Sequence, residues 1–274
     1  MHKTRTVILQ SFDRSGSTAI ARAISSSNDV ELFMQPFNSG SIRERMYEIW
    51  NADMAEESDV SFFQGLENSS IDLDYIKSHW FAEHSTTQKY IPGQLHLIKT
   101  TLNHFTTAWV KEQFPGIDTW GIWRDPMEVL ISLERNNFIN KWYGQAVTEI
   151  TPTVENHSLF CEFRPFLKNI DSEIKEAAFL IAVRSFYLFC HLEENRIIEY
   201  SRFKEKGIDG LQDFIAFYKI TPGEFEFRSS ENLIGKKYQD NVVQSSPIID
   251  SDLNFAIDIF KPLKNLLKDK FNVY

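Results

Sequence analysis

The chain alternates short apolar runs with segments in which apolar residues recur at helical spacing. Runs rich in β-branched or aromatic residues predict five strands, at 7–12, 30–34, 95–100, 118–123 and 196–200. Helical spacing predicts helices at 19–27, 41–50, 101–114, 126–138, 171–194 and 254–271. This alternation indicates an α/β fold: a single three-layer domain over 1–274, with a central parallel sheet flanked by helices. Ligands of such sheets bind at the carboxyl ends of the strands.

The polar segment SFDRSGSTAI, which follows the first strand, has the residues of an anion-binding turn before a helix. Just before and at the start of the helix it offers a glycine, three hydroxyls and one positive charge: Gly16; Ser15, Ser17 and Thr18; and Arg14. A nucleoside-triphosphate P-loop would have glycine at position 11 and lysine at position 17, where this chain has serine. The alternative interpretation is a plain helix start after a strand.

A second strand-to-helix segment, WGIWRDPMEVLISLERNNF, carries another arginine at the carboxyl end of its strand. Pro126 suits the first turn of the helix, and Ser132 follows Arg124 by eight residues, about two helical turns. With the helix folded back on the sheet, both side chains could reach one phosphate. The alternative is a structural Arg124–Asp125 turn.

Together, RSGST after the first strand and WRDPMEVLISL about 110 residues later resemble the motifs of the sulfotransferase family. The resemblance implies that the first motif is a P-loop-like turn that binds the 5′-phosphosulfate of 3′-phosphoadenosine 5′-phosphosulfate (PAPS). It implies that Arg124 and Ser132 bind the 3′-phosphate. The product would then be 3′,5′-ADP (PAP), and no metal would be needed.

Two further segments are similar to parts of the same family. RIIEYSRFKEKG resembles a strand whose tyrosine lies near the adenine; Tyr200 matches, but Ser201 and Arg202 replace an acidic pair. ENLIGKKYQDN loosely resembles a late loop that closes over the 3′-phosphate, which makes Lys236 and Lys237 candidate ligands. An ordinary solvated loop is equally compatible with those lysines.

The resemblance assigns two cations to the chemistry of sulfuryl transfer. Arg14 would stabilise the charge that grows on the bridging oxygen as the sulfuryl group leaves. Lys99, which ends the strand LHLIKT, matches a second family lysine near the transferred group.

The general base is less clear, because Thr101 and Gln35 stand where relatives carry histidine or glutamate. His104, which could approach from the following helix, is the first choice, and the carboxylates of Glu31 and Glu83 are the alternatives.

Composition restricts the partners. The net charge of −9 argues against general nucleic-acid binding and against an anionic membrane surface. The longest apolar run, 177–192, is short for a bilayer and contains Arg184, so no membrane insertion is expected. Two cysteines form neither a disulfide scaffold nor a zinc site, and residues 1–10 do not resemble a secretory signal. A cytoplasmic location is expected.

The acceptor is expected to be a small molecule or a carbohydrate with a hydroxyl or amine. Aromatic residues lie in the segments that would line its pocket, and they equally suit an ordinary core: Phe33, Phe37, Trp80, Phe81, Phe105, Trp142 and Tyr143. The sequence makes no prediction of oligomeric state. Two alternatives remain: a P-loop kinase-like phosphotransferase, and a module that binds PAP without turnover.

Overall fold

The computed structural model describes residues 5–37, 41–68, 70–72, 75, 94–139, 143–225 and 248–273. The chain divides into two compact units, each built from two stretches of sequence. Unit 1 comprises Met1–Trp123 and His191–Phe225, and unit 2 comprises Arg124–Cys190 and Glu226–Tyr274. The expectation of one domain over the whole chain stays a prediction, and each unit is described by itself.

Unit 1 contains a five-stranded, wholly parallel sheet in the order β2-β3-β1-β4-β5. Its strands are β1 Arg5–Gln10, β2 Val30–Met34, β3 Leu95–Thr100, β4 Ile117–Trp123 and β5 Ile197–Glu199. All five predicted strands are present, and the α/β class is confirmed. Strands of a parallel sheet are covered on both faces, which explains why they read as nearly continuous apolar runs.

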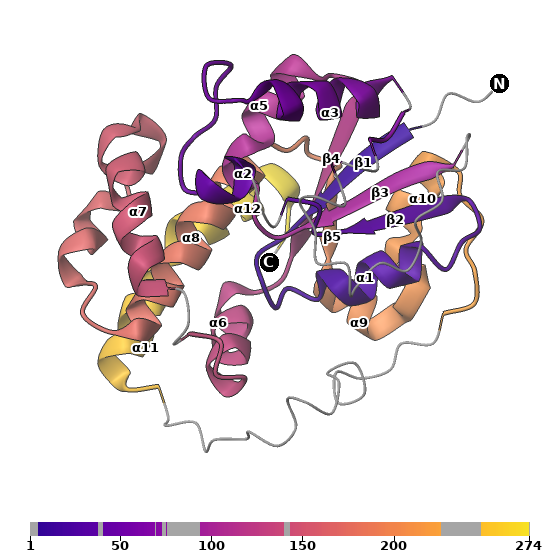
Figure 1. Ribbon diagram of the computed structural model, residues 1–274. Helices are drawn as coiled ribbons and strands as arrows, with labels where there is room; N and C mark the ends of the chain where they lie inside the picture. The colour runs from indigo at the N-terminus through magenta and orange to yellow at the C-terminus, as the bar shows by residue number, and fades with distance from the viewer. Residues whose placement is uncertain are drawn as a thin grey trace. The chain divides into compact units, whose positions relative to one another are not determined.

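Helices of unit 1 cover both faces of this sheet (Figure 1). They are α1 Ser17–Ile24, α2 Ser41–Glu44, α3 Glu57–Glu67, α5 Thr107–Gln113, α9 Tyr200–Lys206 and α10 Gln212–Tyr218, with 3₁₀ turns η2 His104–Thr106 and η6 Gly207–Leu211. Helices α3 and α5 lie over one face, where Ile8, Phe33 and Ile98 join a large aromatic cluster. Helix α1 packs on the other face against β1, β2 and β3.

Unit 2 is helical throughout its described residues. Its elements are α6 Pro126–Arg135, α7 Tyr143–Asn156, η4 Ser158–Phe160, η5 Arg164–Asn169, α8 Glu173–His191, α11 Asp250–Ile259 and α12 Lys261–Phe271. The apolar run predicted as a buried helix forms most of α8. None of the helices in the described ranges has the length and apolar character that a membrane crossing requires.

Several helix boundaries differ from the prediction. The helix expected at 254–271 is two helices that meet at Phe260, because Pro262 in the first turn of α12 has no N–H to continue α11. The helix expected at 41–50 ends at Glu44. Tyr200 begins α9 instead of ending a strand.

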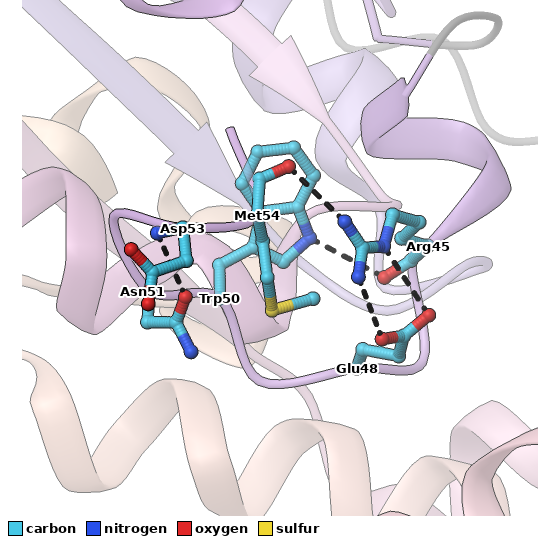
Figure 2. Close-up of polar contacts among 6 residues, drawn as sticks. All are labelled: Arg45, Glu48, Trp50, Asn51, Asp53 and Met54. Carbon is cyan, nitrogen blue, oxygen red and sulfur yellow. Dashed lines mark hydrogen bonds and ion pairs between the residues drawn. The ribbon is translucent and has the colours of Figure 1, made fainter. Parts of the chain in front are cut away.

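The segment between α2 and α3 is fixed by the side chain of Arg45 (Figure 2). Its guanidinium group donates to Glu48 and, at 3.2 Å, to the carbonyl of Met54. The backbone N–H of Trp50 donates to the carbonyl of Phe105 at 3.1 Å. These bonds tie the segment to η2, at the carboxyl end of the sheet.

We predict that Asp59→Ala destabilises the protein by about 3 kcal/mol, since hydrogen bonds to charged groups contribute about 1.5–3 kcal/mol each. Asp59 is fully buried and accepts from the hydroxyls of Ser41 and Tyr75 and from the backbone N–H of Glu56. Chemical denaturation measures the effect. Asp53→Ala, at an exposed position of the preceding segment, is the control and should change stability by less than about 0.5 kcal/mol. Equal stabilities of the two variants would contradict this account.

Candidate functional site

The turn between β1 and α1 is held in an unusual backbone conformation. Both Arg14 and Gly16 have positive φ, 63° and 83°, while the N–H of Ser15 donates to the carbonyl of Phe12 at 3.3 Å. Gly16 stands at the N-cap of α1 and supplies no side-chain cap. The first N–H groups of a helix have no partner within it, so this turn presents donors suited to an anion.

The candidate anion ligands of this turn differ in exposure. Ser15 and Ser17 are buried, and Arg14 and Thr18 are half-buried. The serine hydroxyls therefore belong to the interior of the turn, while Arg14 and Thr18 are partly exposed to solvent.

Tyr200 packs directly on the turn. A Cβ atom added to Gly16 would lie 2.1 and 2.2 Å from two ring carbons of Tyr200. The structure thus brings together two residues that the sequence separates widely, and it explains why position 16 is glycine on two grounds: backbone conformation and space.

Lys99 is the buried cation of the site. Its side chain is 4% exposed, and it lies one residue before the carboxyl end of β3, in register with Leu9 of β1 and Met34 of β2. Burial lowers the pKa of the Lys99 ammonium from its usual 10.5 to about 8, against a smaller opposing effect of the Asp13 carboxylate. The group is still mostly charged at pH 7, and it makes no hydrogen bond or salt bridge with the residues described.

The two positions at which the resemblance in sequence would place a base are hydrogen-bonded to each other. The backbone N–H of Thr101 donates to Gln35 Oε1 at 3.1 Å, and Gln35 Nε2 lies 3.0 Å from Thr101 Oγ1. Gln35 itself has a positive φ of 55°, and its N–H donates to the carbonyl of Lys99 at 2.7 Å. A neutral, mutually satisfied pair therefore occupies this place, and neither member can take a proton at neutral pH.

His104, the first choice for the base, lies in η2 and is completely buried. Its ring is tilted against Phe12, with the centroids 6.2 Å apart. The neighbouring backbone is fixed by Thr107, whose hydroxyl lies 2.7 Å from the carbonyl of His104 and 2.8 Å from Gln10 Oε1. A catalytic role for His104 stays a prediction, and in this arrangement an acceptor would have to enter the interior to reach it.

The alternative bases lie elsewhere. Glu31 is buried near the start of β2, in register with His96, whose Nε2 is 4.0 Å from the carboxylate. Burial lowers the pKa of His96 to about 4. Lys99 is three residues farther along β3, about 10 Å at the usual rise per residue, so Glu31 faces the other end of the sheet. Glu83 lies outside the described residues.

The aromatic residues considered for an acceptor pocket are mostly in the core. Phe33 and Phe37 belong to the cluster under α3, and Phe105 is equally buried. Tyr143 is buried in unit 2. Trp80, Phe81 and Trp142, like Lys236 and Lys237, lie outside the described ranges.

The second motif is in unit 2, at the start of α6. Asp125 caps the helix by accepting from the N–H of Met127 at 2.8 Å, and it also accepts from Lys264 Nζ at 2.9 Å. Arg124 Nε donates to Glu128 at 3.0 Å, and both Arg124 and Ser132 are half-buried. A phosphate bound by Arg124 would compete with the Glu128 carboxylate.

Two buried polar residues of unit 1 were not anticipated from the sequence. Ser11 and Asn103 are 0% and 1% exposed, and none of their side-chain polar atoms has a hydrogen-bond partner among the described residues. Ser11 directly follows β1 and Asn103 lies three residues after β3, and this was the available signal. The sequence alone does not reveal which polar side chains are hydrogen-bonded.

No model of a known protein family matches the chain, and no curated protein is significantly similar to it. The described residues contain no cluster of three or more histidine, cysteine or acidic side chains that could hold a metal ion.

We predict that Gly16→Ala is strongly destabilising and that Tyr200→Ala partly rescues it. Positive φ costs an L-residue about 1–2 kcal/mol, and the clash with the Tyr200 ring adds to this cost. In the Tyr200→Ala background the clash is absent, so Gly16→Ala should cost only the conformational part. A double-mutant cycle on the free energy of unfolding measures the difference. Equal costs in both backgrounds would show that the ring does not restrict position 16.

We predict that Lys99→Met raises the free energy of unfolding at pH 7 by about 3 kcal/mol, the equivalent of a pKa lowered from 10.5 to about 8. Between those pH values the unfolded chain binds more protons than the folded protein, so wild-type stability should rise with pH. The advantage of the variant should therefore shrink from pH 8 to 10.5. Denaturation at several pH values measures it, with the exposed Lys111→Met as control. A constant difference between wild type and Lys99→Met would refute the buried charge.

Proposed function

We propose that this protein is a PAPS-dependent sulfotransferase that transfers a sulfuryl group to a hydroxyl or amine and releases PAP. The observation that carries the proposal is the buried ammonium of Lys99 near the carboxyl end of β3. The same unit contains the β1–α1 turn, in which two residues before the helix have positive φ. A buried cation without an ion-pair partner is costly, and an anionic ligand would remove that cost.

The charges have separate tasks in such a reaction. The acceptor's nucleophilic atom attacks sulfur, and the S–O bond to the phosphate breaks with its electron pair going to the leaving oxygen. The acceptor loses its proton to His104, the candidate base, or to water. Lys99 and Arg14 would stabilise the charge that develops on the leaving oxygen, and Ser15, Ser17 and Thr18 would bind phosphosulfate oxygens. The 3′-phosphate is assigned to Arg124 and Ser132 on the motif in the sequence. A cytoplasmic location also stays a prediction.

Tyr200 would limit one side of the nucleotide site. Its ring lies against Gly16, so the backbone of the turn cannot move toward the ring without a steric clash. A half-buried aromatic ring at this place is also suited to stack on a purine. This supports the role near the adenine that the resemblance implies.

A second candidate function is PAP binding without turnover. The neutral Gln35–Thr101 pair and the complete burial of His104 favour it, because both leave the acceptor side without an accessible base among the groups described there. Release of PAP from PAPS in an acceptor screen separates the two functions, since only the enzyme generates sulfated product.

We predict that 3′,5′-ADP binds at least tenfold more tightly than 5′-AMP or 5′-ADP, with no dependence on magnesium. Hydrogen bonds to a charged phosphate contribute about 1.5–3 kcal/mol, and each 1.4 kcal/mol corresponds to about tenfold in affinity. Titration calorimetry on the wild type measures the preference.

The variant Arg124→Ala tests the assignment of the 3′-phosphate. It should bind 3′,5′-ADP about as weakly as the wild type binds 5′-AMP, while Arg135→Ala, an exposed arginine at the end of the same helix, is the control. Tighter binding of Mg-ATP than of 3′,5′-ADP would overturn the sulfotransferase proposal in favour of a kinase-like phosphotransferase.

A further inference from the structure

Ser11 and Asn103 are a pair of buried side chains whose hydrogen-bonding capacity is unused. The hydroxyl of Ser11 and both polar atoms of the Asn103 amide have no partner among the described residues, although the two residues are 0% and 1% exposed. Most buried polar groups of folded proteins are hydrogen-bonded, so each exception calls for an explanation such as a bound ligand.

The backbone places these two residues at the same edge of the sheet. Ser11 directly follows β1, and its N–H donates to the carbonyl of Thr100 at 3.3 Å. Gln10 Nε2 donates to the carbonyl of Asn103 at 2.9 Å, so Asn103 is attached to the last residue of β1. Lys99 lies on the adjacent strand, one residue before its end. The three polar side chains therefore belong to one group of strand ends.

The backbone of Asn103 is held in place by hydrogen bonds, so its unpaired amide does not result from a loosely held segment. Its carbonyl accepts three hydrogen bonds: from Gln10, from the hydroxyl of Thr106 at 2.8 Å and from the backbone N–H of Thr106 at 3.2 Å. Although it occupies the N-cap of η2, where asparagine commonly caps with its side chain, its amide makes no such bond. The backbone is fixed, and the amide is available.

Two other buried polar residues, both on β1, are hydrogen-bonded within the protein. Gln10 uses both ends of its amide, donating to Asn103 and accepting from Thr107. Thr6, also on β1, donates to the carbonyl of Leu66 at 3.1 Å. Ser11 and Asn103 differ from these two residues in that their side-chain polar atoms have no hydrogen-bond partner among the described residues.

We propose that Asn103 and Ser11, together with Lys99, bind the oxygens of a tetrahedral oxyanion, and that in the reaction this anion is the sulfuryl group in transfer. Asn103 Nδ2 and the Ser11 hydroxyl donate hydrogen bonds to its oxygens, and Asn103 Oδ1 accepts a hydrogen bond from the incoming hydroxyl or amine. Neither residue bonds to sulfur or takes up a proton, so both are positioning residues. The identification of the anion as a sulfuryl group rests on the proposed function, whereas the anion site itself does not.

The experiment measures how inorganic sulfate stabilises the protein against denaturant, with chloride added to keep the ionic strength constant. A ligand that binds only the folded state raises the unfolding free energy, so the dependence on sulfate concentration gives its affinity. Asn103→Leu should raise the denaturation midpoint without sulfate, because it removes an unsatisfied buried group. The same variant should bind sulfate about ten- to a hundredfold more weakly than the wild type.

Two further variants keep the outcome decisive. Ser11→Ala removes a single oxygen and should weaken sulfate in the same direction even if Asn103→Leu folds poorly. The control Thr6→Val removes a satisfied buried hydroxyl, and should lower the midpoint while leaving the sulfate affinity unchanged. If Ser11→Ala and any folded Asn103→Leu bind sulfate as the wild type does, the anion site is refuted.

The nucleotide titrations separate this site from the function. If 3′,5′-ADP binds with the predicted preference but the Asn103 and Ser11 variants retain sulfate affinity, the site is wrong and the function stands. If the variants lose sulfate while 3′,5′-ADP does not bind, the anion site stands and the sulfotransferase proposal fails. A wild type that sulfate does not stabilise overturns the site outright.

Discussion

A positive charge buried near the carboxyl end of β3 is the constraint around which the polar residues of unit 1 are arranged. Lys99 is 4% exposed, and burial disfavours its charged form strongly enough to bring its pKa to about 8. A methionine would satisfy the packing at lower cost. Retaining a lysine there is understandable if a ligand supplies the missing negative charge, since functional sites commonly sacrifice stability in this way.

The turn after β1 complements that charge through its backbone. Left-handed conformations at Arg14 and Gly16 lead into the unsatisfied N–H groups of α1, and the ring of Tyr200 prevents any side chain at position 16. The carboxylate of Asp13 opposes the effect of burial on Lys99. A bound anion would act on Lys99 in the same direction as the Asp13 carboxylate and would raise the pKa of its ammonium further.

The sequence predicts the sheet well because buried parallel strands are nearly continuous apolar runs, as VILQ and LHLI illustrate. It misses α3, whose start is fixed by a reciprocal capping box between Glu56 and Asp59 and whose apolar residues give weak periodicity. Within the site, a positively charged residue and a glycine after a strand were identifiable from local chemistry. The bond between Gln35 and Thr101 joins residues 66 apart in sequence, and only the register of β2 with β3 reveals it.

That bond also limits what kind of acceptor the site would suit. Gln35 and Thr101 satisfy each other and carry no charge, so neither side chain could remove the proton of a hydroxyl acceptor. An enzyme with this arrangement would act best on a nucleophile that loses its proton readily, such as an acidic phenol, because such an acceptor needs little help from a base. The same neutral pair in a protein that only binds PAP would carry no cost, so sulfation that increases with the acidity of the acceptor would support the enzyme over the PAP-binding module.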